Sequence, residues 1–65
     1  MLLGIDTYEF GTLVINTESI KKVEFYKSTA FIELQGETDK IEISLEVWEK
    51  AEVLLDDLGV LKYVD

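Results

Sequence analysis

Short runs of apolar residues, separated by polar turns, fill the first part of the chain. Two runs, Leu2 to Tyr8 and Thr12 to Ile15, are separated by Glu9-Phe10-Gly11. Glycine adopts the left-handed backbone conformations of tight turns, so Gly11 favours a hairpin turn or bulge between two strands. The polar residues 16–19 then predict a turn, because Asn, Thr and Ser side chains bond nearby backbone N–H groups and compete with strand pairing.

Three further strands are expected after this turn, at Ile20 to Tyr26, Ala30 to Leu34 and Lys40 to Ser44. Each shows the period of two that places alternate side chains on opposite faces of a sheet. The links at Lys27-Ser28-Thr29 and at residues 36–39 are short, which implies antiparallel hairpins and therefore a meander. One face of this meander is apolar and must be covered by another element. The residues of this face are Val23, Phe25, Ala30, Ile32, Leu34, Ile41 and Ile43.

Residues 45–58 have the spacing of an amphipathic helix that would provide this cover. Ser44 is suited to the N-cap, because its hydroxyl accepts a bond from a free N–H of the first turn. Gly59 is placed for a left-handed C-terminal cap, with Val60 beyond it in reach of Leu55. The apolar face covers an arc of about 120° at 100° per residue. Its members are Val47, Trp48, Ala51, Leu54, Leu55 and Leu58.

These elements predict one small α+β domain over residues 1–65. It consists of an antiparallel sheet of four to five strands in a meander, with one C-terminal amphipathic helix packed on one face. Residues 61–64 are compatible with either a last strand or an ordered tail. No repeat, low-complexity tract or linker interrupts the chain.

Composition limits the chemistry that such a domain can perform. The 65 residues include 14 Asp and Glu, 6 Lys, no His, no Cys and no Pro, which gives a net charge of −8. Disulfides, thiolate metal sites, Cys nucleophiles, His-based triads and the commonest zinc sites are therefore excluded. The hydrophobic share of 48% is far above that of disordered chains. We expect a folded acidic domain without a metal or cofactor.

Several functional classes become improbable on the same grounds. Catalysis would need a cleft holding paired titratable groups, and a domain of this size lacks the volume for a sizeable pocket, so we expect no enzyme. Six lysines opposed by fourteen acids cannot replace the counterions of a nucleic acid, so we expect no direct nucleic-acid binding. The apolar Met1 to Ile5 is interrupted by Asp6 and follows no basic region, so we expect no secretory signal. No apolar run is long enough to cross a membrane, and a cytoplasmic location is the expectation.

The acidic charge is concentrated around the predicted helix. Residues 1–40 carry 4 − 7 = −3, whereas residues 41–65 carry 2 − 7 = −5. Five carboxylates fall within an arc of about 140° on the outer helix face, and Val53 lies inside that arc. They belong to Glu46, Glu49, Glu52, Asp56 and Asp57. The last two stand at the C-terminal end of the helix, where the helix dipole disfavours negative charge.

This acidic face has three interpretations. It is a solvated face that keeps the domain soluble, a binding surface for a basic protein, or a mimic of DNA phosphates that blocks a nucleic-acid-binding protein. Apolar Val53 among the charges is typical of a contact patch. Candidate partner-binding residues on the helix are Glu46, Glu49, Val53, Asp56 and Asp57.

The outer face of the sheet is a second candidate surface. Val14, Tyr26 and Phe31 are expected there among charged residues. Tyr26 and Phe31 are candidate partner-binding residues because aromatic side chains are favoured interface anchors. Ordinary pairing of these two rings across the hairpin explains the same pattern without a partner.

A chain this short gains only a small net stability from folding. It buries about 60% of its surface, and the apolar gain is nearly balanced by the entropy of ordering. Self-association or an obligate partner would add stability, and an edge strand of an open sheet could extend across a two-fold axis into a dimer. We therefore expect a non-enzymatic, protein-binding accessory or regulatory module, with a homo-oligomer and a monomer both open. The alternative is an acidic nucleic-acid mimic that inhibits a DNA- or RNA-binding protein.

A pattern over about residues 12–55 resembles a known family. Asn16 precedes Ile20 and Val23, then Ile32-Glu33-Leu34 precedes Gly36, and Ile41-Glu42-Ile43 leads into Glu46-Val47. This order resembles the small flagellar-operon proteins of the swarming-motility type, which have an Asn-led turn, strands, a glycine turn and a terminal helix. The family is typically more basic after its glycine, where this chain has Glu37 and Asp39. The resemblance implies a non-catalytic accessory protein that acts through partners.

Overall fold

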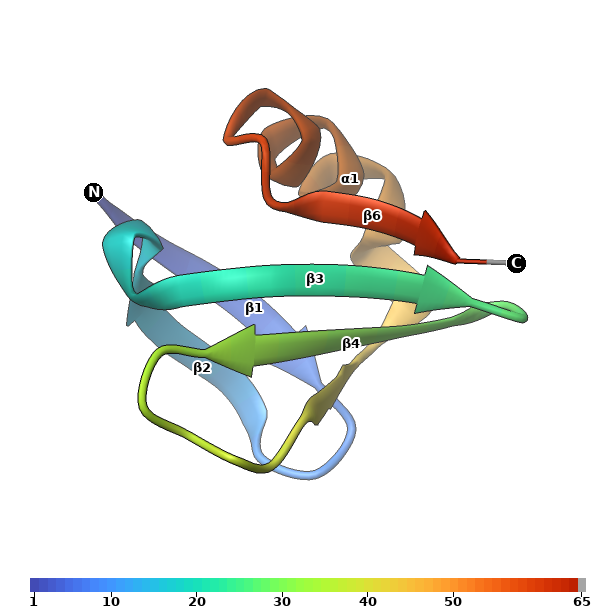
Figure 1. Ribbon diagram of the computed structural model, residues 1–65. Coiled ribbons are helices and arrows are strands. Elements are labelled where there is room, and N and C mark those ends of the chain that lie inside the picture. The colour runs from blue at the N-terminus through green and yellow to red at the C-terminus, as the bar shows by residue number, and fades with distance from the viewer. Residues whose placement is uncertain (65) are drawn as a thin grey trace.

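The computed structural model describes residues 1–64, except the side chain of Val47. Six strands form one sheet, with one α-helix near the C-terminus (Figure 1). The elements are β1 (Leu2–Thr7), β2 (Gly11–Asn16), η1 (Thr17–Ser19), β3 (Ile20–Tyr26), β4 (Thr29–Leu34), β5 (Ile41–Ile43), η2 (Leu45–Val47), α1 (Trp48–Asp57) and β6 (Leu61–Val64), where η1 and η2 are single 3₁₀ turns. The predicted α+β class is confirmed, and the sheet has six strands where four to five were expected.

The strand order is β2-β1-β5-β4-β3-β6, so the predicted meander β3-β4-β5 forms the middle of the sheet. These strands are antiparallel, and Val23 pairs with Ile32 while Phe25 pairs with Ala30. The link between β3 and β4 is a two-residue turn in which Lys27 and Ser28 have φ of 48° and 62°. Two successive left-handed residues are the signature of the hairpin turn whose twist matches the strands.

The N-terminal hairpin β1–β2 lies behind β3 and β4 in Figure 1 and encloses the core from that side. Its turn is held by Thr7, whose hydroxyl donates to the carbonyl of Gly11 at 2.8 Å and accepts the N–H of Phe10 at 3.0 Å. Gly11 has φ of 70°, as its position in the turn predicted. Thr7 also pairs with Ile43, which joins the hairpin to β5.

Ser44 is the predicted N-cap, and its hydroxyl accepts the N–H of Glu46 at 3.4 Å. The first turn after it is the 3₁₀ turn η2, so the α-helix proper begins at Trp48. The end of the helix also follows the prediction. Gly59 has φ of 76°, and its N–H donates to the carbonyl of Asp56 at 3.0 Å. The N–H of Val60 donates to the carbonyl of Leu55 at 3.3 Å. These are the two bonds of a Schellman motif, which reverses the chain.

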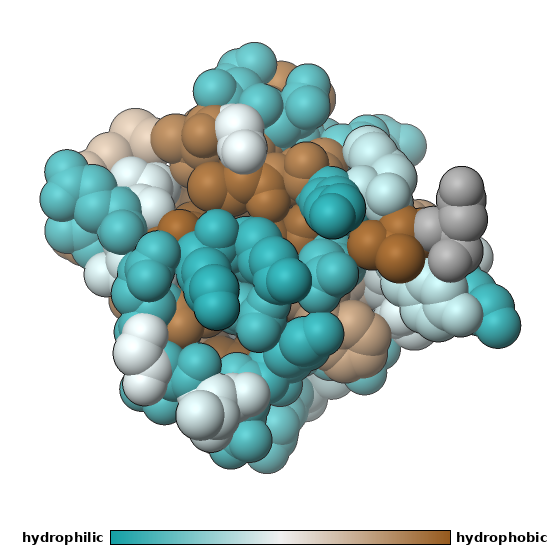
Figure 2. All heavy atoms as spheres, in the orientation of Figure 1, coloured by the Kyte–Doolittle hydropathy of each residue, from teal (hydrophilic) through white to brown (hydrophobic). Residues whose placement is uncertain are grey.

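The reversed chain forms β6, which runs parallel to β3 at the edge of the sheet. This resolves the alternative at residues 61–64 in favour of a strand. The helix packs over the same face as the inward residues of the meander, and the core lies between them and the hairpin. The buried core consists of Ile5, Ile20, Val23, Ala30, Ile32, Ile43 and Leu55. On the opposite face, over β3 and β4, Figure 2 shows a band of hydrophilic side chains with hydrophobic atoms on either side.

Candidate functional site

A hollow of about 280 Å³ lies between α1 and β6. Val53 is 64% exposed and Tyr63 is 57% exposed, so two large apolar groups reach the solvent there. Three carboxylates surround them. We call this surface the acidic hollow, and its lining is Glu52, Val53, Asp56, Asp57 and Tyr63.

Both elements of the acidic hollow are positioned by local structure. Val53 is followed by Asp56 and Asp57 three and four positions later, which places all three on one helix face. The Schellman motif then returns the chain alongside β3, where Tyr63 pairs with Phe25. The two rings lie 5.8 Å apart between centroids. Tyr63 is therefore held against the sheet while its hydroxyl extends toward the helix.

The hydroxyl of Tyr63 donates a hydrogen bond to the carboxylate of Glu52. This bond stabilises the protonated phenol and raises the pKa of Tyr63 from 10.0 to about 12, with smaller contributions from burial and from the negative charges of Glu52 and Asp56. The phenol thus remains a hydrogen-bond donor over the whole physiological range. It links β6 to α1 across the hollow.

A late ionisation of Tyr63 is the expected consequence. Because its pKa in the folded state is raised to about 12 from 10.0, its stabilising effect is complete below pH 10 and is lost as the pH rises from 10 to 12. An alkaline titration followed by tyrosinate absorbance should show a step near pH 12, and Tyr63→Phe should lack it. Glu52→Gln should move that step to lower pH. A late step that persists in Tyr63→Phe would assign it to another tyrosine.

The predicted helix residues do not all gather at the acidic hollow. Val53, Asp56 and Asp57 line it, whereas Glu46 and Glu49 lie near the start of the helix. These two are exposed and line a separate hollow of about 360 Å³ together with Leu45 and Lys50. Tyr63 was not singled out by sequence reasoning, although the alternation of Leu61 and Tyr63 with Lys62 after the glycine cap is the signal of a strand.

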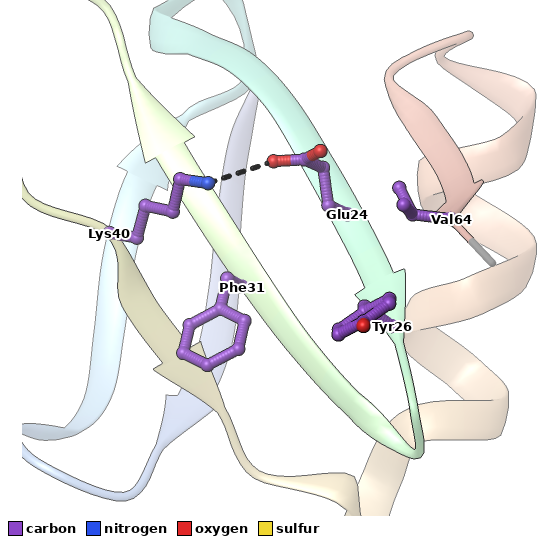
Figure 3. A pocket seen from close by; sticks show the side chains of 5 residues that line it. All are labelled: Glu24, Tyr26, Phe31, Lys40 and Val64. Carbon is purple, nitrogen blue, oxygen red and sulfur yellow. Dashed lines mark hydrogen bonds and ion pairs between the residues drawn. The ribbon is translucent and has the colours of Figure 1, made fainter.

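A second hollow, of about 330 Å³, lies on the outer face of the sheet. Figure 3 shows Lys40 reaching across β4 to Glu24, with the rings of Tyr26 and Phe31 beside this pair. Val64 on β6 completes the lining. The predicted residues Tyr26 and Phe31 are therefore neighbours, but they lie diagonally across strands β3 and β4 rather than directly opposite each other. Tyr26 pairs directly with Thr29, and Phe31 pairs with Glu24, because the turn between the strands has two residues.

Ion pairs neutralise this outer face. Lys40 Nζ lies 3.1 Å from Glu24 Oε1, and Lys22 Nζ lies 3.3 Å from Glu33 Oε2. The hydrogen bond from Lys40 lowers the pKa of Glu24, and the same bond raises the pKa of Lys40. The carboxylates are half-buried, but the lysines are exposed to solvent, so the pairs add little stability. They distinguish the outer face, where both signs of charge alternate, from the acidic hollow.

Within residues 1–64, no cluster of three or more His, Cys, Asp or Glu side chains has a geometry that could hold a metal ion. In that part of the chain no helix has the length and apolar character required to cross a bilayer. The chain matches no protein-family model, no curated protein and no solved structure. The resemblance to the flagellar-operon proteins therefore stays a prediction.

Proposed function

We propose that this chain is a non-enzymatic protein-binding module whose acidic hollow binds a basic segment of another protein. The observation that carries the proposal is the exposure of Val53 and Tyr63 among the three carboxylates of the hollow. A Lys or Arg side chain has an apolar stem and a cationic head. The stem covers the apolar groups, and the head reaches a carboxylate and the face of the Tyr63 ring.

The electrostatics of the free domain favour such a partner. The last turn of α1 contains no basic residue, and Asp56 and Asp57 stand at the negative end of the helix dipole. Like charges on one helix face repel each other as well. A bound cation relieves both the unfavourable dipole interaction and the repulsion between carboxylates. The helix is therefore more stable in the complex than in the free domain. Charge alone does not account for the exposed Val53. This residue favours a partner that also makes an apolar contact over one that recognises only charges resembling DNA phosphates.

Val53→Lys is the sharpest test, because it places a cation at the centre of the hollow. The side chain is largely exposed, so folding should be unaffected. The probe is a synthetic peptide in which lysines and arginines alternate with leucines, titrated calorimetrically. We expect the substitution to weaken binding by about tenfold or more, which corresponds to at least about 1.4 kcal/mol.

Val14→Lys is the matched control. It makes the same substitution, changes the net charge equally and replaces a valine that is 67% exposed, but it lies on β2 at the other end of the strand order. Binding should remain unchanged in this variant. Equal weakening by both variants would show a non-specific effect of net charge and refute the acidic hollow as the site. Loss of all binding at moderate salt would instead favour the charge mimic, since a contact that buries Val53 keeps an apolar component.

A further inference from the structure

Strand β2 is an edge strand without a charged residue. It is the last strand in the sheet order and pairs only with β1 among the described elements. Its residues are Gly11-Thr12-Leu13-Val14-Ile15-Asn16. Edge strands are normally protected by charged side chains, proline, a bulge or a covering element. The opposite edge has such protection, because β6 carries Lys62 and lies beside α1.

The hydrogen bonds of the hairpin show which backbone groups of β2 face outward. The N–H of Thr17 donates to the carbonyl of Met1 at 2.9 Å and thereby continues the β1–β2 ladder, whereas the carbonyl of Asp6 accepts the N–H of Ser44 at 2.8 Å on the β5 side. Odd-numbered residues therefore form the hydrogen-bonded pairs between β1 and β2, because the two kinds of pair alternate in antiparallel strands. It follows that the outward N–H groups on β2 belong to Thr12, Val14 and Asn16. The free outward C=O groups belong to Thr12 and Val14, because Asn16 is the N-cap of η1 and its carbonyl accepts the first bond of that turn.

The side chain of Val14, at the middle of β2, is not covered by other side chains. Val14 is 67% exposed, and its direct partner on β1 is Gly4, which has no side chain to cover it. Leu2 lies diagonally on the same face and is 71% exposed. The edge thus combines unpaired backbone groups with an apolar patch.

We propose that β2 pairs with β2 of a second copy of this chain, antiparallel about a two-fold axis at Val14. In this register Val14 lies opposite its counterpart, and Thr12 lies opposite Asn16 of the partner subunit. The two Val14 residues then exchange both of their backbone bonds, and the N–H of Asn16 donates to the carbonyl of Thr12 in the other copy, because a strand centred on one residue is self-complementary about a two-fold axis. The Val14 and Leu2 patches of the two copies become neighbours across the joined sheet.

Charge identifies a second copy as the occupant. Two chains with a net charge of −8 repel each other, so they approach at the lowest cost where no charge is present. Residues 11–16 carry no charge, and the carboxylate of Asp6 on β1 beside them is hydrogen-bonded to the hydroxyl of Thr12, so this edge offers a basic partner far fewer ion pairs than the acidic hollow does. This surface is separate from the acidic hollow, so the failure of one proposal leaves the other standing.

Val14→Pro tests the pairing directly. The N–H of Val14 points outward, so proline removes a donor from the proposed dimer and leaves the β1–β2 ladder intact, as is tolerated on edge strands. Sedimentation velocity of the full chain over a micromolar concentration series should show a dimer for the wild type and a monomer for Val14→Pro. Far-ultraviolet circular dichroism should be the same for both. A wild-type chain that stays monomeric across the series would overturn the proposal.

Val14→Lys is a second variant that keeps the test decisive if proline disturbs the hairpin. It places two ammonium groups opposite each other across the axis, so dimerisation should weaken by about tenfold or more. Val53→Lys is the matched control and should leave the dimer intact. A dimer that survives both substitutions at Val14 would show that association uses another surface.

Amide hydrogen exchange gives a residue-level reading of the same interface. The amides of Val14 and Asn16 should be protected only at concentrations where the dimer forms, whereas those of Leu13 and Ile15 should be protected at all concentrations. Equal protection of both pairs in the monomer would contradict the assignment of the outward groups.

Discussion

Leu55→Ala is expected to lower the free energy of unfolding by about 2–5 kcal/mol. Leu55 has 0% exposure and is the point at which the helix enters the core. Truncation removes apolar contacts and leaves a cavity that a close-packed interior fills only in part. A domain of 65 residues has a total stability of roughly 3–10 kcal/mol, so the variant should be partly unfolded near room temperature. Urea unfolding followed by the fluorescence of Trp48 measures the change.

Val53→Ala is the control for this prediction. It shortens an aliphatic side chain on the same helix two positions earlier, where the residue is largely exposed. Its effect should stay within about 0.5 kcal/mol, because substitutions at exposed helix positions remove few contacts. Similar losses at the two positions would contradict the orientation of α1 on the sheet.

The orientation of α1 and the order of the meander were predictable because both depend on local physical constraints. A helix must repeat its apolar side chains every 3.6 residues and a strand every two. In each segment only one choice of inward-facing residues therefore places all the apolar side chains in the core. The cap at Gly59 was predictable for the same reason, since φ of 76° is readily adopted only by glycine. These features require no knowledge of distant parts of the chain.

Strand β6 and its parallel pairing required knowledge of the whole topology. Four residues with weak alternation do not specify a partner strand, and the place beside β3 exists only once α1 has packed across the sheet. Tyr63 was missed for this reason. The turn at Lys27 and Ser28 also lacks the Asn-Gly signature that announces a two-residue hairpin, so a three-residue link was expected instead.

The candidate site was predicted in part. The outward face of Val53, Asp56 and Asp57 follows from helical spacing, and all three line the acidic hollow. Glu46 was included in the same arc by counting 100° per residue. It lies in the 3₁₀ turn η2, where each residue turns about 120°, so its angle relative to α1 departs from the count.

Trp48→Ala is the second substitution with a large expected effect. Trp48 stands at the first position of α1, is partly buried, and stacks on Phe25 with ring centroids 5.4 Å apart and an interplanar angle of 29°. Phe25 in turn contacts the ring of Tyr63. Three aromatic rings therefore join the helix to β3 and β6. Removing the first of them should lower the free energy of unfolding by roughly 2–4 kcal/mol, somewhat less than for a fully buried Trp.

A double-mutant cycle separates the stacking from simple loss of burial. Phe25→Leu keeps an apolar side chain but removes the ring, so its coupling with Trp48→Ala should be about 0.5–1.5 kcal/mol. Unfolding is measured by circular dichroism, because Trp48 is the only tryptophan and is absent from the variant.

The alkaline titration provides a second reading, since loss of Trp48 frees Phe25 to move and loosens the support of Tyr63. Its ionisation step should then shift below pH 12 toward the ordinary value of 10.0. Additive stabilities and an unchanged step would mean that the three rings act independently, and that the sheet pairing of β6 with β3 alone positions Tyr63 in the acidic hollow.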